Sequence, residues 1–188
     1  MKRKKLLMLI ISLITALVLT ACSSGSNNKS DEDSMEGMDH SEMNHSGSSE
    51  LPEGLKEAEN PKYKVGSTAI INADHMEGMN GAEATITGAY DTTVYTVSYT
   101  PTTGGEKVTN HKWVVHEEIE NAQEQPYKVG EEVTLTADHI EGMECAKATI
   151  DSTEQTTVYV VDYTPTNGGE KVTNHKWVTE SELSPSNE

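Results

Sequence analysis

The second part of the chain repeats the first at a constant offset, which brings Tyr63 back as Tyr127. Residues 63–119 align with residues 127–183 without a gap, and 35 of the 57 aligned positions are identical. One stretch, Gly104 to Val114, returns unchanged as Gly168 to Val178. Solenoids normally need three or more stacked units, so two copies of this length predict two separate domains, at residues 61–120 and 125–184. The linker 121–125 is short enough to let the two small domains pack together for mutual support.

Inside each copy, apolar residues alternate with polar ones, which is the pattern of half-buried β-strands. Strands are predicted around residues 69–73, 82–86, 95–99 and 107–114, and around the matching residues of the second copy. Pro101 and Gly104-Gly105 predict a turn before the last strand, and the Glu-containing segments 117–119 and 180–183 predict one short helical turn. We therefore expect an all-β protein with two tandem, small antiparallel barrels, similar in strand order to SH3-like barrels.

The chain up to Cys22 has the pattern of an export signal. A basic head, Lys2 to Lys5, precedes fourteen mostly apolar residues, Leu6 to Leu19, and then Thr20-Ala21-Cys22. At about 1.5 Å per residue this run spans about 21 Å, less than the ~30 Å that a permanent transmembrane helix must cross. The end of the run resembles a bacterial lipobox. We predict removal of residues 1–21, acylation of Cys22, for example with palmitate, and anchoring outside the cytoplasmic membrane. The alternative is an ordinary cleaved signal with an incidental cysteine.

Residues 22–60 are predicted to form a lipidated, disordered tether. The segment is rich in Ser, Asp, Glu, Gly and Asn, and it contains too few apolar residues to offset its ordering entropy.

The predicted mature chain is strongly acidic. Removal of residues 1–21 takes away four of 14 Lys+Arg and none of 31 Asp+Glu, which leaves a formal charge of −21. This charge disfavours a nucleic-acid partner, because phosphate binding needs a basic face. It also disfavours anionic lipid headgroups, so membrane contact is expected through the lipid anchor alone. The charge attracts cations, although solubility of an exported protein explains it equally well.

The predicted tether contains a dense group of soft metal ligands. Thioether sulfur suits Cu(I) or Ag(I), and imidazole suits both copper oxidation states. Five such residues fall within eleven positions: Met35, Met38, His40, Met43 and His45. A flexible chain with this spacing can wrap several donors around one ion. The alternative is that the segment is an inert acidic spacer.

Three motifs resemble the YdhK-like family of bacterial lipoproteins, which have tandem domains. These motifs are Asp74 to Met79, Tyr95 to Pro101 and Asn110 to Val114, with their counterparts in the second copy. The resemblance covers residues 61–184 and the lipobox. It implies a surface lipoprotein, and some members of the family are associated with copper tolerance. The second copy departs at Ile140, where the first has Met76, and at Cys145, where the first has Gly81.

Each copy also offers candidate metal ligands of its own. If the loop after the first strand folds over the last strand, one ion can be held by His75, Met76, Met79 and His111. The matching set in the second copy is His139, Met143 and His175. Trp113 and Trp177 lie two residues beyond His111 and His175 and can shield Cu(I) from water. The alternative is that Met79 and Met143 are core residues and that the histidines form hydrogen bonds with the backbone.

These patterns predict an exported, membrane-anchored lipoprotein that sequesters Cu(I), with Ag(I) as a second candidate, and so contributes to metal tolerance. Copper is then the cargo, and no cofactor is needed for folding. No hydrolase, zinc-protease or phosphate-binding motif is present, and the carboxylates are expected on solvated faces, so we expect no enzymatic activity. The alternative is a cell-envelope interaction module that binds wall polymer or a protein partner through its barrels.

Overall fold

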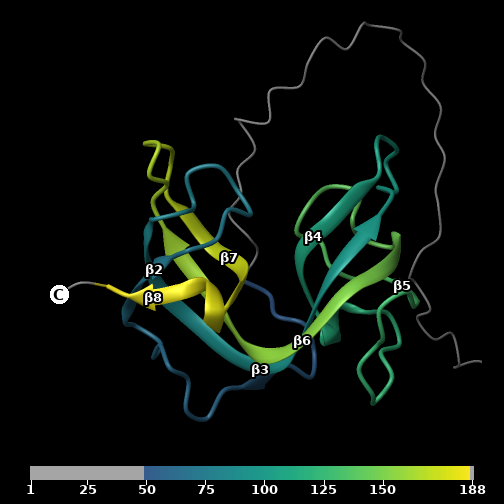
Figure 1. Cartoon of the computed structure of the whole chain (residues 1–188), viewed down its shortest axis with the longest axis horizontal. Coiled ribbons are helices and arrows are strands. Elements are labelled where there is room, and N and C mark those ends of the chain that lie inside the picture. The colour runs from purple at the N-terminus through teal and green to yellow at the C-terminus, as the bar shows by residue number, and fades with distance from the viewer. Residues whose placement is uncertain (1–48, 187–188) are drawn as a thin grey trace, which may run out of the picture. The chain divides into compact units, whose positions relative to one another are not determined.

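The computed structural model describes residues 49–186 (Figure 1). Within this range all strand pairings are antiparallel and there is no α-helix, which confirms the all-β prediction. Two short 3₁₀ turns, η2 and η3, stand where one helical turn per copy was predicted. In chain order the elements are β1 (Lys56–Glu57), β2 (Thr68–Ile71), β3 (Glu83–Tyr99), β4 (Val108–Val115), η2 (His116–Glu118), β5 (Glu132–Thr134), β6 (Lys147–Tyr163), β7 (Val172–Thr179), η3 (Glu180–Glu182) and β8 (Leu183–Pro185).

Two long strands, β3 and β6, organise the fold. They pair along their whole length, from Ala84 opposite Tyr163 to Tyr99 opposite Ala148, and they run side by side in Figure 1. At the middle of this pairing Thr92 lies opposite Thr156, which is its equivalent in the second repeat. Equivalent residues therefore face each other, and the register relates the two repeats by an approximate two-fold axis.

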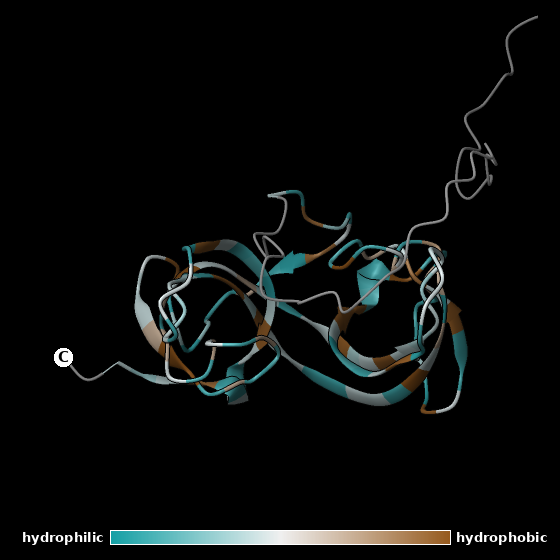
Figure 2. Cartoon of the chain, turned by 90° about the horizontal axis from the view of Figure 1, so that it is seen from above, coloured by the Kyte–Doolittle hydropathy of each residue, from teal (hydrophilic) through white to brown (hydrophobic). Residues whose placement is uncertain are grey.

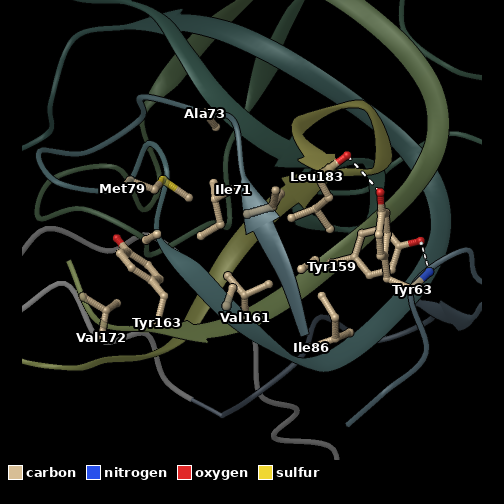
Figure 3. Packing of buried hydrophobic residues seen from close by; sticks show 14 of the residues in the cluster. Tyr63, Ile71, Ala73, Met79, Ile86, Tyr159, Val161, Tyr163, Val172 and Leu183 are labelled. Atoms are coloured by element: carbon tan, nitrogen blue, oxygen red, sulfur yellow. Dashed lines mark hydrogen bonds between the residues drawn. The ribbon is translucent and has the colours of Figure 1, made fainter. Parts of the chain in front are cut away.

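Because β3 and β6 are antiparallel, each end of the pair joins half of one repeat to half of the other. We call the two ends the terminal lobe and the middle lobe. The core of the terminal lobe joins the first half of repeat 1 to the second half of repeat 2: Tyr63, Ala69, Ile71, Ala73, Met79, Ala82, Ala84, Ile86 and Ala89 with Tyr159, Val161, Tyr163, Val172, Val178 and Leu183 (Figure 3). The core of the middle lobe joins the other two halves: Tyr95, Val97, Tyr99, Val114 and Ile119 with Val133, Leu135, Ala137, Met143, Ala146, Ala148 and Ile150.

This arrangement corrects the expectation of one barrel per repeat. Residues 61–120 and 125–184 describe the repeats of the sequence, but the hydrophobic cores do not follow those ranges. The separate strands expected at 82–86 and 95–99 are one continuous strand, because the residues between them are compatible with a strand and include no proline. SH3-like closure is not confirmed: one sheet runs β5-β6-β3-β2-β8, with β1, β4 and β7 pairing off this path. Apolar and polar bands alternate along its strands (Figure 2).

Side chains from both lobes meet in a third, smaller group that we call the central cluster. Its members are Val94, Trp113, Val115, Val158, Val160 and Trp177. Tyr90 packs against it, with its ring 6.1 Å from that of Trp177. The cluster buries both tryptophans between the lobes.

The last part of the predicted tether belongs to the folded body. Strand β1 pairs with Tyr90 and Asp91 of β3, and Leu55 packs against the central cluster. The folded body therefore includes residues on the N-terminal side of the predicted boundary at residue 60. The predicted signal segment, Cys22 and the five tail ligands lie outside the described residues. No helix within residues 49–186 has the length and apolar character needed to cross a membrane.

Candidate functional site

A buried carboxylate in each lobe connects a histidine of that lobe to a tryptophan of the other lobe. In the terminal lobe, Glu182 bonds to His75 Nε2 at 2.8 Å and accepts the Nε1–H of Trp113 at 2.8 Å. The middle lobe repeats this arrangement with Glu118, His139 and Trp177. Glu118 and Glu182 are only 4% and 9% exposed, so the expectation that the carboxylates lie on solvated faces is wrong for these two.

Local sequence explains how these carboxylates are aimed inward. Each lies five residues after its repeat's tryptophan, at the end of the 3₁₀ turn that follows β4 or β7. The backbone N–H of Val115 donates to Glu118, and that of Thr179 donates to Glu182, at 3.1 Å in both cases. These bonds fold each side chain back over its own turn. The identical spacing from tryptophan to glutamate in both repeats is the sequence signal that points to this pair.

The surroundings of both carboxylates favour the ionised form. Burial alone would raise the pKa of Glu182, but the hydrogen bond and charge of His75, with the N–H groups of Thr179 and Trp113, lower that pKa to about 2. For Glu118, burial is likewise outweighed by the charge and hydrogen bond of His139, so its pKa lies below the ordinary value. Both groups are therefore carboxylates that accept hydrogen bonds near neutral pH.

The histidines pair between repeats, not within them. The ring centroids of His75 and His175 are 6.5 Å apart in the terminal lobe, and those of His111 and His139 are 6.2 Å apart in the middle lobe. The prediction grouped His75 with His111 and His139 with His175, whereas the ring contacts join His75 to His175 and His111 to His139; His75 nevertheless lies near enough to His111 for its charge to act on the pKa of His111. The reason is the exchange of halves: the loop of one repeat lies over the last strand of the other.

The predicted sulfur ligands have different surroundings. Met79 and Met143 are fully buried in the cores of the terminal and middle lobes, where packing alone accounts for them. Figure 3 shows Met79 within the core of the terminal lobe. Met76 is only partly buried, and its Sδ lies 3.9 Å from the hydroxyl of Tyr163, which donates to it. Ile140 takes the place of Met76 in the middle lobe and is 43% exposed. Only the terminal lobe therefore has a thioether at this position.

Some buried polar atoms have no hydrogen-bond partner among residues 49–186, and they include His75 Nδ1, His111 Nε2 and the hydroxyl of Tyr99. Tyr99 is the counterpart of Tyr163, and the replacement of Met76 by Ile140 explains why its hydroxyl lacks an acceptor. Burial, followed by the nearby charges of His139 and His75, lowers the pKa of His111 from 6.5 to about 4. His111 is therefore neutral near pH 7.

Hairpins of one repeat hold the histidine loops of the other. The backbone N–H of Thr166 donates to the carbonyl of Gly78, and that of Thr102 donates to the carbonyl of Gly142, at 2.8 Å each. Gly78 has φ +75°, and a Cβ there would lie 2.7 Å from Asn167 Oδ1. The close approach fixes the loop that carries His75 and Met76.

One more histidine has a structural role. His116 accepts a hydrogen bond from the Tyr95 hydroxyl at its Nδ1 and donates from Nε2 to the carbonyl of Gln123. It therefore ties the linker between the repeats to the middle lobe. The second repeat has Glu180 at this position.

The described part of the chain contains no group of three or more His, Cys, Asp or Glu side chains placed to hold a metal ion. What each lobe offers is a pair of histidines, one backed by a carboxylate, and in the terminal lobe a thioether beside them. Imidazole is a ligand of several transition metals and thioether is a soft ligand, whereas Ca²⁺ and Mg²⁺ prefer oxygen ligands.

Comparison with known proteins places the repeats in a family. The family model described as "Protein of unknown function (DUF1541)" matches residues 65–116 and 129–180. The chain is 56% identical over 188 residues to "Uncharacterized protein YdhK" of Bacillus subtilis (strain 168), a match that covers 98% of this chain and 91% of that protein. A crystal structure of that DUF1541 family protein is similar with a TM-score of 0.75 and 63% identity, and it covers 78% of this chain and 100% of the solved one. A solution NMR structure of the YdhK C-terminal domain gives a TM-score of 0.63 and covers 65% of this chain and 93% of that domain.

Proposed function

This chain belongs to the DUF1541 family, and we propose that it is an exported, lipid-anchored protein that binds and sequesters Cu(I), and also Ag(I), outside the cytoplasmic membrane. Capture in this proposal is stoichiometric and involves no catalysis. The observation that carries it is the group of three methionines and two histidines within residues 35–45.

The export and anchoring part rests on the segment that ends at Cys22. A basic head, a short apolar run and Thr20-Ala21-Cys22 favour cleavage before Cys22 and its acylation. Two or more acyl chains give stable membrane attachment where one chain does not. The acidic mature chain then attracts cations to the outer face of the membrane.

The metal-binding part rests on ligand chemistry. Met35, Met38 and Met43 supply soft sulfur, and His40 and His45 supply imidazole. Methionine exposed outside the cell is prone to oxidation, so its concentration in a polar segment favours a specific use. The paired histidines of the two lobes add imidazole donors, which suit both oxidation states of copper.

The test is a Cu(I) titration of the reduced mature protein against a chromophoric Cu(I) chelator. We expect about one or more Cu(I) per tail, and loss of this capacity when Met35, Met38 and Met43 are all replaced by Leu, which keeps their size and removes the sulfur. A matched control in the same segment replaces Ser34, Ser41 and Ser46 by Ala and should retain the full capacity. If the leucine variant retains it as well, the tail is not part of the mechanism.

A further inference from the structure

The edge of β3 that faces away from β6 is covered at its middle by the N-terminal segment. Strand β1 pairs there with Lys56 opposite Asp91, and the backbone N–H of Ala58 donates to the carbonyl of Ala89 at 3.0 Å. Leu55, which precedes β1, packs against the central cluster. This edge therefore accepts an extended segment as an additional strand, with an apolar side chain against the cluster.

The corresponding edge of β6 has no such strand among residues 49–186. On the side away from β3, β6 pairs with β5 at residues 147–149 and with β7 at residues 158–163. Between these pairings lie Asp151 to Thr157, which we call the open edge. It runs beside the middle of β3, where the two long strands pass from one lobe to the other (Figure 1).

Covalent connection explains why this edge stays open. Glu120 in the linker is the counterpart of Lys56 in β1, but its N–H donates to the carbonyl of Thr134 in β5 at 2.9 Å. The neighbouring Ile119 forms an antiparallel bridge with Leu135. The linker is therefore held beside β5, and repeat 2 does not place a strand along the open edge.

The exposure of the two strands agrees with this difference. Ala89 and Thr92 of β3 are buried, whereas their counterparts on β6 are less buried: Thr153 is exposed and Thr156 is half-buried. The carbonyl of Ala89 faces β1, and the direction of backbone groups alternates along a strand, so the backbone groups of Thr153 and Gln155 face outward at the open edge. A row of such unpaired groups is a template for a further strand.

The central cluster is also less covered on this side. Tyr90 of β3 packs its ring 6.1 Å from that of Trp177, which is fully buried. Glu154 takes the place of Tyr90 on β6, and Trp113, the counterpart of Trp177, is 7% exposed. An apolar side chain from a docked strand would cover Trp113 as Leu55 covers the cluster from β1.

Lys112 supplies a donor for the backbone of a docked strand. Its counterpart Lys176 donates to the carbonyl of Glu50, in the segment that leads into β1. The Nζ of Lys112 lies 5.1 Å from the ring centroid of Trp113 and makes a long ion pair with Glu182 at 3.5 Å. The side chain of Lys112 is 42% exposed, so its ammonium group is available to a second acceptor.

Charge decides which kind of strand fits the open edge. The chain carries a formal charge of −17, and Glu154 is exposed at the centre of the open edge. The N-terminal segment of a second copy is disfavoured, because residues 50–60 contain four glutamates and one lysine. Two copies paired symmetrically through their open edges are also disfavoured, since their Glu154 side chains would lie close together. A basic segment has the complementary charge.

We propose that the open edge of β6 binds an extended, basic segment of another protein as an additional antiparallel strand. The segment places an apolar side chain against Trp113 and basic side chains near Glu154, and Lys112 donates to its backbone. In strand addition of this kind, main-chain hydrogen bonds give the affinity and side chains give the specificity. The inference does not depend on metal binding by the tail or by the lobes.

The probe is a peptide that copies residues 50–60 with its charge reversed. The changes in the peptide are Glu50→Lys, Glu53→Lys, Glu57→Lys and Glu59→Lys. It is titrated into the whole mature chain while ¹⁵N NMR follows the backbone amides and the indole N–H groups. We expect one equivalent to bind and to shift the amides of Thr153 and Gln155 together with the Trp113 indole. Hydrogen exchange of these two amides should slow at least about tenfold.

Matched peptides separate strand addition from general attraction to an acidic protein. The same basic peptide, N-methylated at the nitrogens that correspond to Lys56 and Ala58, keeps its charge but loses the N–H groups that pair in β1. It should not protect the open edge. The unchanged acidic peptide should bind more weakly than the basic one.

Two changes in the protein test the open edge itself. Gln155→Pro removes an N–H that faces outward and none that pairs with β3, so the fold should persist while binding weakens about tenfold. Glu154→Gln should weaken binding about two- to fivefold. The matched control Glu106→Gln, at an exposed position in the hairpin between β3 and β4, should leave the affinity unchanged. Dispersed amide spectra verify that each variant is folded.

Three results would overturn the proposal. Equal binding of the N-methylated peptide, or full affinity in folded Gln155→Pro, would leave only electrostatic attraction. Amide shifts that spread over the acidic surface and spare the open edge would do the same. Slow hydrogen exchange of Thr153 and Gln155 without any peptide would show that a segment of the chain itself covers the open edge, which would contradict a site for another protein.

Discussion

The terminal and middle lobes are built from equivalent halves, yet their polar interiors differ at a few positions. Both keep the chain from histidine through glutamate to tryptophan, and both bury a methionine in the core. They differ where Met76 is replaced by Ile140, so Tyr163 has a sulfur acceptor and Tyr99 has none among residues 49–186. The comparison teaches that duplication has preserved the scaffold that positions the histidines, while one donor beside them has changed.

The lobes also hold each other together. Trp113 comes from the middle lobe and donates to a carboxylate of the terminal lobe, and Trp177 makes the reciprocal bond. Lys112 adds a long ion pair to Glu182 at 3.5 Å, whereas its counterpart Lys176 bonds to the carbonyl of Glu50 instead. The N-terminal segment therefore contacts one side of a nearly two-fold arrangement and not the other.

The most severe test of this arrangement is removal of one repeat. A fragment of residues 61–124 contains half of each core, so one copy cannot complete either lobe. We expect it to fold only as a symmetric dimer, with Thr92 of each copy opposite the other, and to unfold on dilution. Sedimentation and NMR over a concentration series measure this. A folded monomer at all concentrations would contradict the exchange of halves.

The next largest effect is expected for the buried carboxylates. Glu182→Ala leaves the Trp113 and Thr179 donors without their acceptor, and Glu118→Ala does the same to Trp177 and Val115. Each change should lower the free energy of unfolding by about 3–5 kcal/mol. Urea denaturation measures the loss. If one lobe tolerates the change, the reciprocal coupling of the lobes is wrong.

The exposed glutamates of the turns provide matched controls for those two variants. Glu106 and Glu170 are equivalent in the repeats and exposed. Their replacement by Ala should change the free energy of unfolding by no more than about 0.5 kcal/mol.

A smaller effect on the free energy of unfolding is expected from pH. His111 of the middle lobe and Glu182 of the terminal lobe should act in different pH ranges. The pKa of His111 is lowered from 6.5 to about 4, so the unfolded chain binds this proton more strongly and stability falls as pH drops from about 6.5 to about 4. The loss should be about 1–3 kcal/mol. The pKa of Glu182 is lowered from 4.5 to about 2, so its contribution is lost at lower pH, between about 4.5 and about 2.

Urea denaturation of metal-free protein across this pH range tests the assignment. His111→Gln should flatten the stability profile between pH about 6.5 and about 4 and leave the more acidic part unchanged. A profile that keeps its full slope in the variant would assign the upper pH window to another group.

The smallest expected effect concerns the two tyrosine hydroxyls. Tyr99→Phe removes a buried hydroxyl without an acceptor in residues 49–186 and should raise stability slightly, whereas Tyr163→Phe removes the contact to Met76 and should lower it. Both changes should stay below about 1 kcal/mol, with opposite signs. Thermal unfolding of both variants, compared with the parent, measures them. Equal signs would mean that Met76 and Ile140 are equivalent neighbours.

Much of the fold follows from the sequence, but not its connectivity. Alternation at 69–73, 95–99 and 107–114 predicts strands close to those observed, and the acidic turns after Trp113 and Trp177 are found as 3₁₀ turns. Periodicity does not say which partner a strand takes. The alternation is equally compatible with pairing of β3 inside its own repeat and with pairing of β3 with β6. The partner of β3 therefore becomes known only from the structure.

The candidate site could be predicted only in part, again because the sequence does not determine which strands are partners. The residue types His75, Met76, His111, His139 and His175 could be selected from the sequence, because the repeat marks most of them twice. Their grouping could not, since it depends on which halves share a lobe. Glu118 and Glu182 were missed as inward-facing groups because a carboxylate in an acidic turn ordinarily faces water, and only their hydrogen bonds with tryptophan and histidine explain their burial.

The exchange of halves between the repeats is most directly tested by methyl NOEs in protein labelled at Ile and Val. In the structure Ile86 lies opposite Val161 in the terminal lobe, and Val97 lies opposite Ile150 in the middle lobe. The account predicts strong NOEs between Ile86 and Val161 and between Ile150 and Val97. NOEs from Ile86 to Val97 and from Ile150 to Val161 in their place would mean one core per repeat, and would contradict both the fold and the pairing of His75 with His175.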